Sequence, residues 1–119
     1  MIGARLLLWL RILRFFNGLT IRSWLNLFVS LLVDIISLLT TKHIRNPKLL
    51  WPGLYLVKQY NFIIYVRGAD DIYHALPRRE DRAHDFIVSV LRSSDVFVDV
   101  GANIGYYTIL GSKLVGSKG

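Results

Sequence analysis

The sequence predicts an α/β fold, and three features of the 119-residue chain indicate it. An apolar run with helical spacing occupies residues 6–41. Two short runs rich in branched and aromatic residues follow at 54–58 and 62–66. A further apolar run at 95–100 leads into a glycine-bounded loop and then into a helical pattern. Strands and helices that alternate along a chain in this way are typical of α/β proteins.

The amino-terminal run, taken with its flanks as residues 1–45, is expected to form a hydrophobic helical segment. Its polar residues recur every three or four positions, so they share one narrow stripe of a helix. The stripe consists of Arg11, Arg14, Gly18, Arg22, Asn26, Ser30, Asp34, Ser37 and Thr41. Any break in this helix is expected at Asn17–Gly18, where turn-forming residues are adjacent.

One interpretation of this segment is an interfacial amphipathic helix on a membrane. In that case Arg11, Arg14 and Arg22 point toward lipid phosphates. Trp9 and Trp24 then lie at the headgroup boundary. A membrane surface is accordingly an expected partner of the apolar run, and the expected location is the cytoplasm with membrane association.

The same segment admits two other interpretations. A single membrane span over 23–41 has the necessary length of about nineteen residues. Asp34 lies inside that span, where a carboxylate costs about 2.5–3.5 kcal/mol. Alternatively, the helix caps the rest of the protein and buries its wide apolar face against it. A cleavable signal peptide fits poorly, because arginines interrupt the first apolar run.

The second part of the chain, residues 46–119, is expected to open with a β-hairpin. Its strands are the runs at 54–58 and 62–66, which are separated by three polar residues. A helix is expected over 82–92, with four apolar residues on its buried side. These are Phe86, Ile87, Val90 and Leu91.

The stretch 95–108 is the most informative, because it predicts a strand, a loop and the start of a helix. Its strand residues are Val96, Phe97, Val98 and Val100. A branched and aromatic run of this kind fits a strand buried on both faces. Asp99 places a carboxylate near the strand end, where it can attract a cationic group. Gly101 allows a sharp turn and the close approach of a ligand. Gly105 permits tight packing where the helix begins, and the first amides of that helix can bind polar ligand groups.

The spacing of this loop argues against a dinucleotide ligand. The dinucleotide fingerprint is G-x-G-x-x-G, whereas the order here is Asp-x-Gly-x-x-x-Gly, with Asn103 in place of a middle glycine. The pattern resembles the first motif of class I S-adenosylmethionine-dependent methyltransferases. The longer string from Val98 to Thr108 is similar to that of the FkbM-type methyltransferases. Residues 66–72 also resemble an Arg-Gly-x-x-Asp segment that often precedes the domain in that family.

The resemblance implies a Rossmann-like methyltransferase domain that begins with this strand–loop–helix unit, after the β-hairpin and the hydrophobic helical region. It implies S-adenosyl-L-methionine as the cofactor and an oxygen of a sugar or small metabolite as the methyl acceptor. The residues that it places at the cofactor are Asp99, Gly101, Ala102, Asn103, Gly105 and Tyr106. For Tyr106 a place in the core is the alternative. Methyl transfer does not require a nucleophile–base pair, and the sequence indicates none, so no catalytic residue is assigned.

The resemblance also implies that the chain is an amino-terminal fragment of such an enzyme. In the family an acidic residue after the second strand holds the ribose of the cofactor, and its counterpart here would lie beyond Gly119. The fragment alone is therefore expected to be inactive.

Composition and charge limit the remaining possibilities. The chain has no cysteine, which excludes disulfides and thiolate metal sites. His43, His74 and His84 have no partner at metal-ligand spacing, so no metal site is expected. The net charge of +7 suits an anionic membrane surface or a nucleic acid, but no nucleic-acid module is recognised and no nucleic-acid partner is expected. Asp70 and Asp71 are expected in a solvated turn.

Two functions of other classes stay open beside the methyltransferase. A small membrane-associated binding or scaffold protein would use the glycine turn only as structure. A fragment of a dinucleotide-dependent Rossmann enzyme would bind a dinucleotide in the same loop. Binding of S-adenosylmethionine separates both from the methyltransferase.

Overall fold

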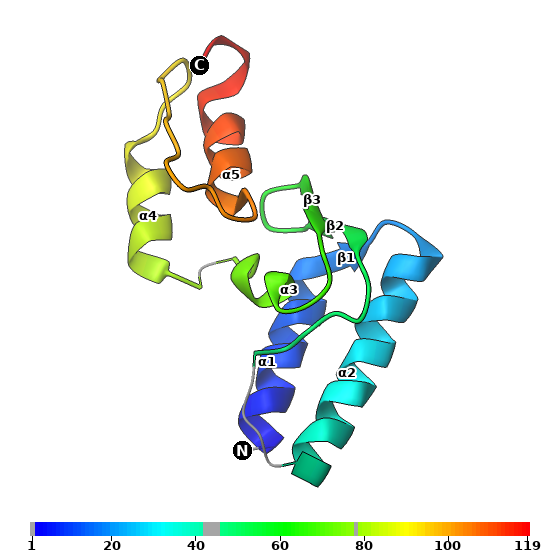
Figure 1. Cartoon of the computed structure of the whole chain (residues 1–119). Helices are drawn as coiled ribbons and strands as arrows, with labels where there is room; N and C mark the ends of the chain where they lie inside the picture. The colour runs from blue at the N-terminus through cyan, green and yellow to red at the C-terminus, as the bar shows by residue number, and fades with distance from the viewer. Residues whose placement is uncertain (1, 42–45, 78) are drawn as a thin grey trace.

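The computed structural model describes residues 2–41, 46–77 and 79–119 (Figure 1). The elements in chain order are α1 (Ile2–Phe15), β1 (Phe16–Gly18), α2 (Ile21–Thr41), β2 (Gly53–Val57), β3 (Phe62–Val66), α3 (Asp71–His74), α4 (Asp81–Val90), α5 (Tyr106–Val115) and the 3₁₀ turn η1 (Gly116–Lys118). The fold is mixed α and β, with apolar helices at the amino terminus. Figure 1 shows α1 and α2 as an antiparallel pair, with α4 and α5 on the other side of the sheet.

The sheet has three antiparallel strands in the order β1-β2-β3. The β2–β3 hairpin confirms the hairpin that the sequence predicts, with Val57 opposite Phe62 at the turn. In β3 alternate residues are buried, as the period of two in a strand requires. Strand β1 pairs Phe16 with Val57 and was not predicted, because its three residues give no period of their own. The described chain contains this one sheet, and the parallel sheet of a Rossmann-like domain is not part of it.

The expected break in the amino-terminal helix is confirmed, and it separates α1 from α2. A Cβ atom added to Gly18 would lie 2.7 Å from the backbone nitrogen of Trp24, so the chain needs glycine for this close approach. The Thr20 hydroxyl then accepts a hydrogen bond from the Ser23 amide at 3.1 Å, which satisfies an amide in the first turn of α2. The break therefore converts one long helix into a helical hairpin whose connection is a strand of the sheet.

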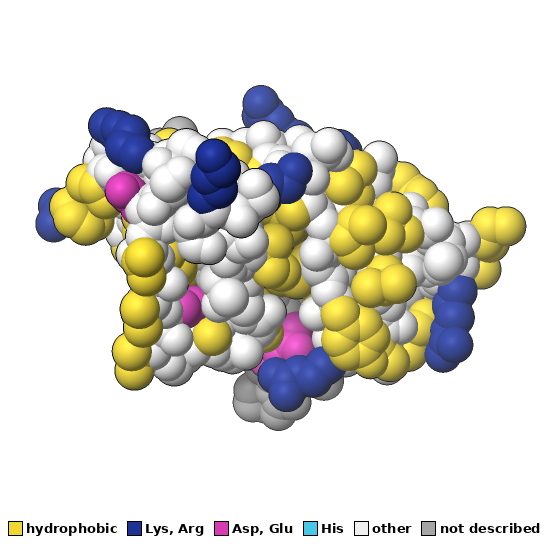
Figure 2. Space-filling model, turned by 90° about the horizontal axis from the view of Figure 1, so that it is seen from above, with side chains coloured by type: hydrophobic (Ala, Val, Ile, Leu, Met, Phe, Trp, Pro, Cys, Tyr) yellow, Lys and Arg dark blue, Asp and Glu magenta, His cyan; other side chains and the backbone are white. Residues whose placement is uncertain are grey.

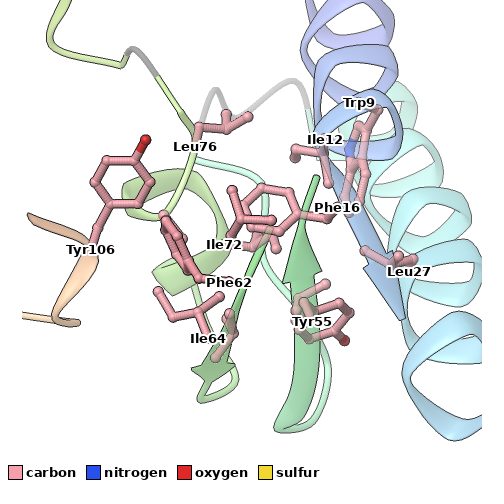
Figure 3. Packing of buried hydrophobic residues seen from close by; sticks show 14 of the residues in the cluster. Trp9, Ile12, Phe16, Leu27, Tyr55, Phe62, Ile64, Ile72, Leu76 and Tyr106 are labelled. Carbon is pink, nitrogen blue, oxygen red and sulfur yellow. The ribbon is translucent and has the colours of Figure 1, made fainter. Parts of the chain in front are cut away.

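One hydrophobic core includes residues from both sides of the expected boundary at 45/46 (Figure 3). Phe16 and Tyr55 meet edge to face, with ring centroids 6.4 Å apart. Trp9 is also fully buried in this core. The expected position of Trp9 at a headgroup boundary is therefore wrong. The physical reason is that its indole Nε1 donates a hydrogen bond to Asp34 at 2.7 Å, which turns the ring inward.

The middle of the polar stripe faces inward along α2, whereas Arg22, Ser37 and Thr41 are exposed. Asn26 and Ser30 are both buried. The Asn26 amide donates to the Tyr55 hydroxyl at 2.9 Å, and its oxygen accepts from the Ser30 hydroxyl at 3.1 Å. The backbone amide of Leu50 donates to the Asn26 oxygen at 3.2 Å. These polar side chains therefore hold the segment before β2 against the helix.

Among the described residues, α2 alone is long and apolar enough to cross a membrane. This finding depends on length and composition. A core helix of a soluble protein or a signal sequence near the amino terminus would meet the same criteria. It is weak evidence for membrane contact by itself.

The buried strand that the sequence predicts at 95–100 is not formed. The segment is extended, but Val96, Val98 and Val100 are between 75% and 91% exposed. Phe97 faces the other way, and its ring occupies the space that a Cβ atom on Gly111 of α5 would need. A strand buried on both faces requires neighbouring strands and a second covering layer. Segment 95–100 has neither in the described chain, so only its Phe97 side is covered.

Helix α4 confirms the predicted helix but not its predicted buried side. Phe86 and Val90 are exposed, whereas Ile87 and Leu91 are half-buried. His84 is the buried residue of this helix. Its Nε2 lies 2.6 Å from the Tyr60 hydroxyl, so a polar contact sets the rotation of the helix.

Candidate functional site

The loop between segment 95–100 and α5 has an unusual backbone conformation. Gly101, Asn103 and Gly105 have φ angles of 77°, 52° and 79°, respectively. A Cβ atom added to Gly101 or Gly105 would meet nothing within 4 Å. The two glycines are therefore required by the left-handed backbone and not by lack of space. Asparagine is among the side chains that tolerate this conformation best, which accounts for Asn103.

The loop closes on itself where α5 begins. The Gly105 amide donates to the Ala102 carbonyl at 2.8 Å, and the Ile109 amide donates to the Gly105 carbonyl at 3.0 Å. The amides of Tyr106, Tyr107 and Thr108 precede the first intrahelical hydrogen bond. Such amides have no carbonyl partner inside a helix, and they carry the positive end of its dipole. The start of α5 is consequently suited to a negatively charged group.

Asp99 is fixed beside this helix start. Its Oδ2 accepts a hydrogen bond from the Thr108 hydroxyl at 2.5 Å, and its side chain is partly buried. Its Oδ1 has no hydrogen-bond partner in the part of the chain that the structure describes. One carboxylate oxygen thus holds the side chain in place, and the other is left to bind a cation or a donor.

The loop lines a cavity of about 210 Å³. Five of the six residues predicted for the cofactor are in its wall, namely Asp99, Gly101, Ala102, Asn103 and Tyr106. Gly105 is not in the wall, and it fixes the start of α5 instead. Pockets for whole small-molecule ligands begin at about 300 Å³. The cavity is therefore of a size to take one end of a ligand.

The cavity also has a second wall, which the sequence did not predict. Its residues are His74, Arg79, Glu80 and Tyr107, together with Ile104 of the loop. Arg79 and Glu80 are exposed and form an ion pair at 2.5 Å. Burial raises the pKa of the Tyr107 hydroxyl, and the nearby charge of Glu80 adds to this effect. About twenty residues separate Arg79 and Glu80 from Asp99, so no local pattern could reveal that they share a cavity.

His74 contributes an unsatisfied polar atom to this wall. Its Nδ1 is buried and has no hydrogen-bond partner among the described residues. Its Nε2 lies 3.6 Å from Asp70 Oδ2. Buried polar atoms normally have partners, so this unpaired Nδ1 is an exception among the described residues.

Tyr106 occupies the core as well as the cavity wall. It is 5% exposed, and its ring meets that of Phe62 at 5.7 Å. Its hydroxyl lies 3.4 Å from His84 Nδ1. Burial raises the pKa of this hydroxyl. Tyr106 therefore takes the core position that was its alternative and also lines the cavity.

The other candidate ligand residues take structural positions. Asp71 is buried and accepts a hydrogen bond from Arg67 Nε at 2.8 Å, so the expected solvated turn is wrong for this residue. The hydrogen bond from Asn46 lowers the pKa of Asp70. The described residues contain no group of three side chains that could hold a metal ion. His43 lies outside the described residues.

Comparisons with protein-family models, curated proteins and solved structures found no match to this chain.

Proposed function

We propose that the loop from Asp99 to Gly105 binds the methionine end of S-adenosylmethionine. In this proposal the chain is the amino-terminal part of a methyltransferase of the FkbM type. One observation carries the proposal: the Asp99 carboxylate and the start of α5 lie in the wall of the same cavity. The resemblance of residues 98–108 to the family motif supports it independently.

The charges of the cavity wall are complementary to an amino-acid group. The methionine end of the cofactor has a cationic amine and an anionic carboxylate. Asp99 Oδ1 would accept a hydrogen bond from the amine, and the free amides of α5 would bind the carboxylate. A cavity of about 210 Å³ suits this end of the cofactor better than the whole molecule.

The bound cofactor supplies an activated methyl group on a sulfonium. The residues of this chain then have to hold and orient the cofactor, since proximity and alignment are the main requirement of a direct displacement. Asp99 orients the amine, and the left-handed loop keeps side chains away from the ligand. We propose an oxygen of a sugar or small metabolite as the acceptor, which rests on the family resemblance alone.

The exposed valines support a further part of the proposal. Segment 95–100 is extended, its Phe97 side is packed on α5, and its valine side is open. This is the state expected of a strand whose neighbours are absent. We propose that it becomes the first strand of a Rossmann-like parallel sheet when further strands pair with it.

An amide NMR titration of the full chain with S-adenosylmethionine tests the cofactor site. We expect the amide signals of Tyr106, Tyr107 and Thr108 to shift. We expect Asp99→Asn to weaken binding about tenfold or more, because a hydrogen bond to a charged group contributes about 1.5–3 kcal/mol. Asp95→Asn is the matched control, since it removes the same charge from a residue outside the cavity wall.

Three outcomes would overturn the assignment. Absence of any shift with S-adenosylmethionine favours the scaffold function, in which the glycine turn is only structural. Shifts with NAD in place of S-adenosylmethionine favour the dinucleotide-dependent enzyme. Equal weakening by the Asp99 and Asp95 substitutions shows that neither carboxylate binds the ligand directly.

A second proposal concerns the location of the protein. We propose a cytoplasmic protein that contacts a membrane through residues 2–41. Helix α2 has the length and apolar composition for membrane contact. Many of its apolar side chains are exposed, which favours membrane contact over a helix that buries its apolar face against the rest of the protein.

A further inference from the structure

Helix α2 presents its apolar side outward and its polar side inward. Its outer stripe consists of Ile21, Leu25, Phe28, Leu32, Ile36 and Leu39, at spacings of three or four residues. These six side chains are between 49% and 82% exposed. On the opposite side of the same helix, Ser23, Asn26 and Ser30 are buried. A helix on the surface of a soluble protein has the reverse arrangement.

The inward polar groups are all engaged with protein. Asp34 forms an ion pair with Arg5 of α1 at 3.2 Å and also accepts the hydrogen bond from Trp9. Asn26 and Ser30 bind each other and the backbone amide of Leu50. These polar side chains form their hydrogen bonds on the inner side of α2, so they do not lie among the apolar side chains of the outer stripe. This arrangement is typical of helices that contact lipid.

Helix α1 also has exposed apolar side chains. Ile2, Leu6, Leu7 and Leu10 are between 43% and 65% exposed. Figure 2 shows hydrophobic side chains gathered on the side of the molecule where α2 lies in Figure 1, with Lys and Arg side chains near them. We call the exposed apolar side chains of α1 and α2 the outer face. Exposed apolar side chains in this number on two neighbouring helices are typical of an interaction site.

Exposed positive charges lie near both ends of the helical hairpin, with three arginines near β1 and Lys48 beside the end of α2. Arg14 lies in the last turn of α1, and Arg22 lies in the first turn of α2, so both flank β1. Arg11 is one turn earlier in α1, and all three are exposed. The acid of the hairpin, Asp34, is neutralised internally by Arg5. The surface of the hairpin is therefore complementary to a negatively charged partner.

We infer that the outer face docks on an anionic lipid bilayer, with its apolar side chains in the acyl boundary and Arg11, Arg14 and Arg22 at the phosphates. This inference rests on the proposed membrane contact and specifies its surface and its lipid. A second copy of the chain is a poorer partner, because the exposed apolar side chains extend over both helices.

The hairpin lies along the bilayer surface and does not cross it. Residues 46–50 run beside the inner side of α2, and the Leu50 amide bonds to Ser30 at 3.1 Å. A groove of about 260 Å³ on this side has both apolar and polar lining residues, and the polar ones include Asp34, Asn46 and Lys48. A span would carry this irregular polar backbone into the hydrocarbon, where it is not tolerated. The inner side consequently faces protein and water, and only the outer face meets lipid.

Sedimentation of the full chain with lipid vesicles tests the inference. We expect binding to vesicles that contain phosphatidylserine and much weaker binding to pure phosphatidylcholine. Replacement of Arg11, Arg14 and Arg22 by Gln should weaken binding on the order of a hundredfold, at about fivefold for each arginine near an anionic surface. High salt and alkaline carbonate should release the protein from the vesicles.

A substitution on the outer face tests whether vesicle binding uses this surface or any exposed apolar side chain. Leu32→Glu should abolish sedimentation, because Leu32 is 61% exposed in the middle of the outer stripe. Ile63→Glu is the matched control, since Ile63 is 53% exposed on β3, away from the outer face, and should leave binding unchanged. Circular dichroism of both variants checks that each one folds.

Each other result contradicts a defined part of the inference. No sedimentation with any vesicle overturns the membrane contact itself, and the cofactor titration is independent of that result. Equal binding to both vesicle types overturns the anionic partner. Resistance to salt and carbonate indicates a span. A dimer in solution that Leu32→Glu converts to a monomer shows that a second copy covers the outer face.

Discussion

Gly105 shows how a single backbone angle can determine whether a site forms. Its φ of 79° and ψ of 15° place it in the left-handed region at the start of α5. An L side chain in this region costs about 1–2 kcal/mol, even where space is open. Position 105 therefore requires glycine because of its backbone conformation, and not because neighbouring atoms leave too little space.

We expect Gly105→Ala to lower the free energy of unfolding by about 1–2 kcal/mol. Urea unfolding followed by circular dichroism measures the change. Gly3→Ala is the control, because Gly3 also has open space around its Cβ position but lies within α1. That substitution should raise stability by up to about 1 kcal/mol. Similar losses in both variants would show that the backbone angle of Gly105 is not the cause.

The site residues that the sequence predicted are those that are neighbours along the chain. Asp99, Gly101 and Asn103 belong to one loop, so their proximity follows from chain connectivity. Arg79 and Glu80 reach the same cavity only because of the way α4 packs. That packing depends on His84 and Tyr60, which are far apart in sequence. No spacing rule could bring these residues together.

At the scale of elements, α2 depends on one buried asparagine. The Asn26 side chain contacts Tyr55, Leu50 and Trp51, and so links the helix to β2 and to the segment before it. Loss of this side chain would leave buried polar partners without hydrogen bonds. Each such partner costs about 1–3 kcal/mol.

We therefore expect Asn26→Ala to destabilise the protein by at least about 2 kcal/mol in urea unfolding. Thr40→Ala is the control on the same helix, because the exposed Thr40 hydroxyl bonds only to carbonyls of α2 itself. Its effect should stay within about 0.5 kcal/mol. An equal, small effect at both positions would contradict the anchoring role of Asn26.

The elements with local signals were predicted, and those that depend on distant partners were not. The β2–β3 hairpin and the break at Gly18 follow from adjacent residues. Strand β1 exists because β2 pairs with it, and segment 95–100 is exposed because no strand does. A hydrophobic side chain favours burial, but it is buried only where another strand or helix packs against it.

At the scale of the whole molecule, Tyr106 connects the sheet to α4 and α5. Burial raises the pKa of its hydroxyl above the ordinary value of 10.0. The unfolded chain therefore loses this proton first as pH rises. The stability contributed by the protonated tyrosine is fully present below about pH 10 and is lost at higher pH.

We expect the free energy of unfolding to fall from about pH 10 upward, and to fall less in Tyr106→Phe. Urea unfolding at a series of pH values measures the slope. Burial also raises the pKa of Tyr55 and Tyr107, so part of the slope should remain in the variant. An unchanged slope in Tyr106→Phe would show that this hydroxyl ionises equally in both states.

The open valine side of segment 95–100 also affects how the chain behaves in concentrated solution. An extended segment with unpaired backbone and exposed branched side chains is a template for intermolecular strand addition and aggregation. Asp95 precedes the three valines and Asp99 lies between the last two, and charges in or beside such a segment act as gatekeepers against aggregation. Asp99 therefore has a protective role that is separate from any ligand. Its replacement should make the chain less soluble even where no cofactor is present.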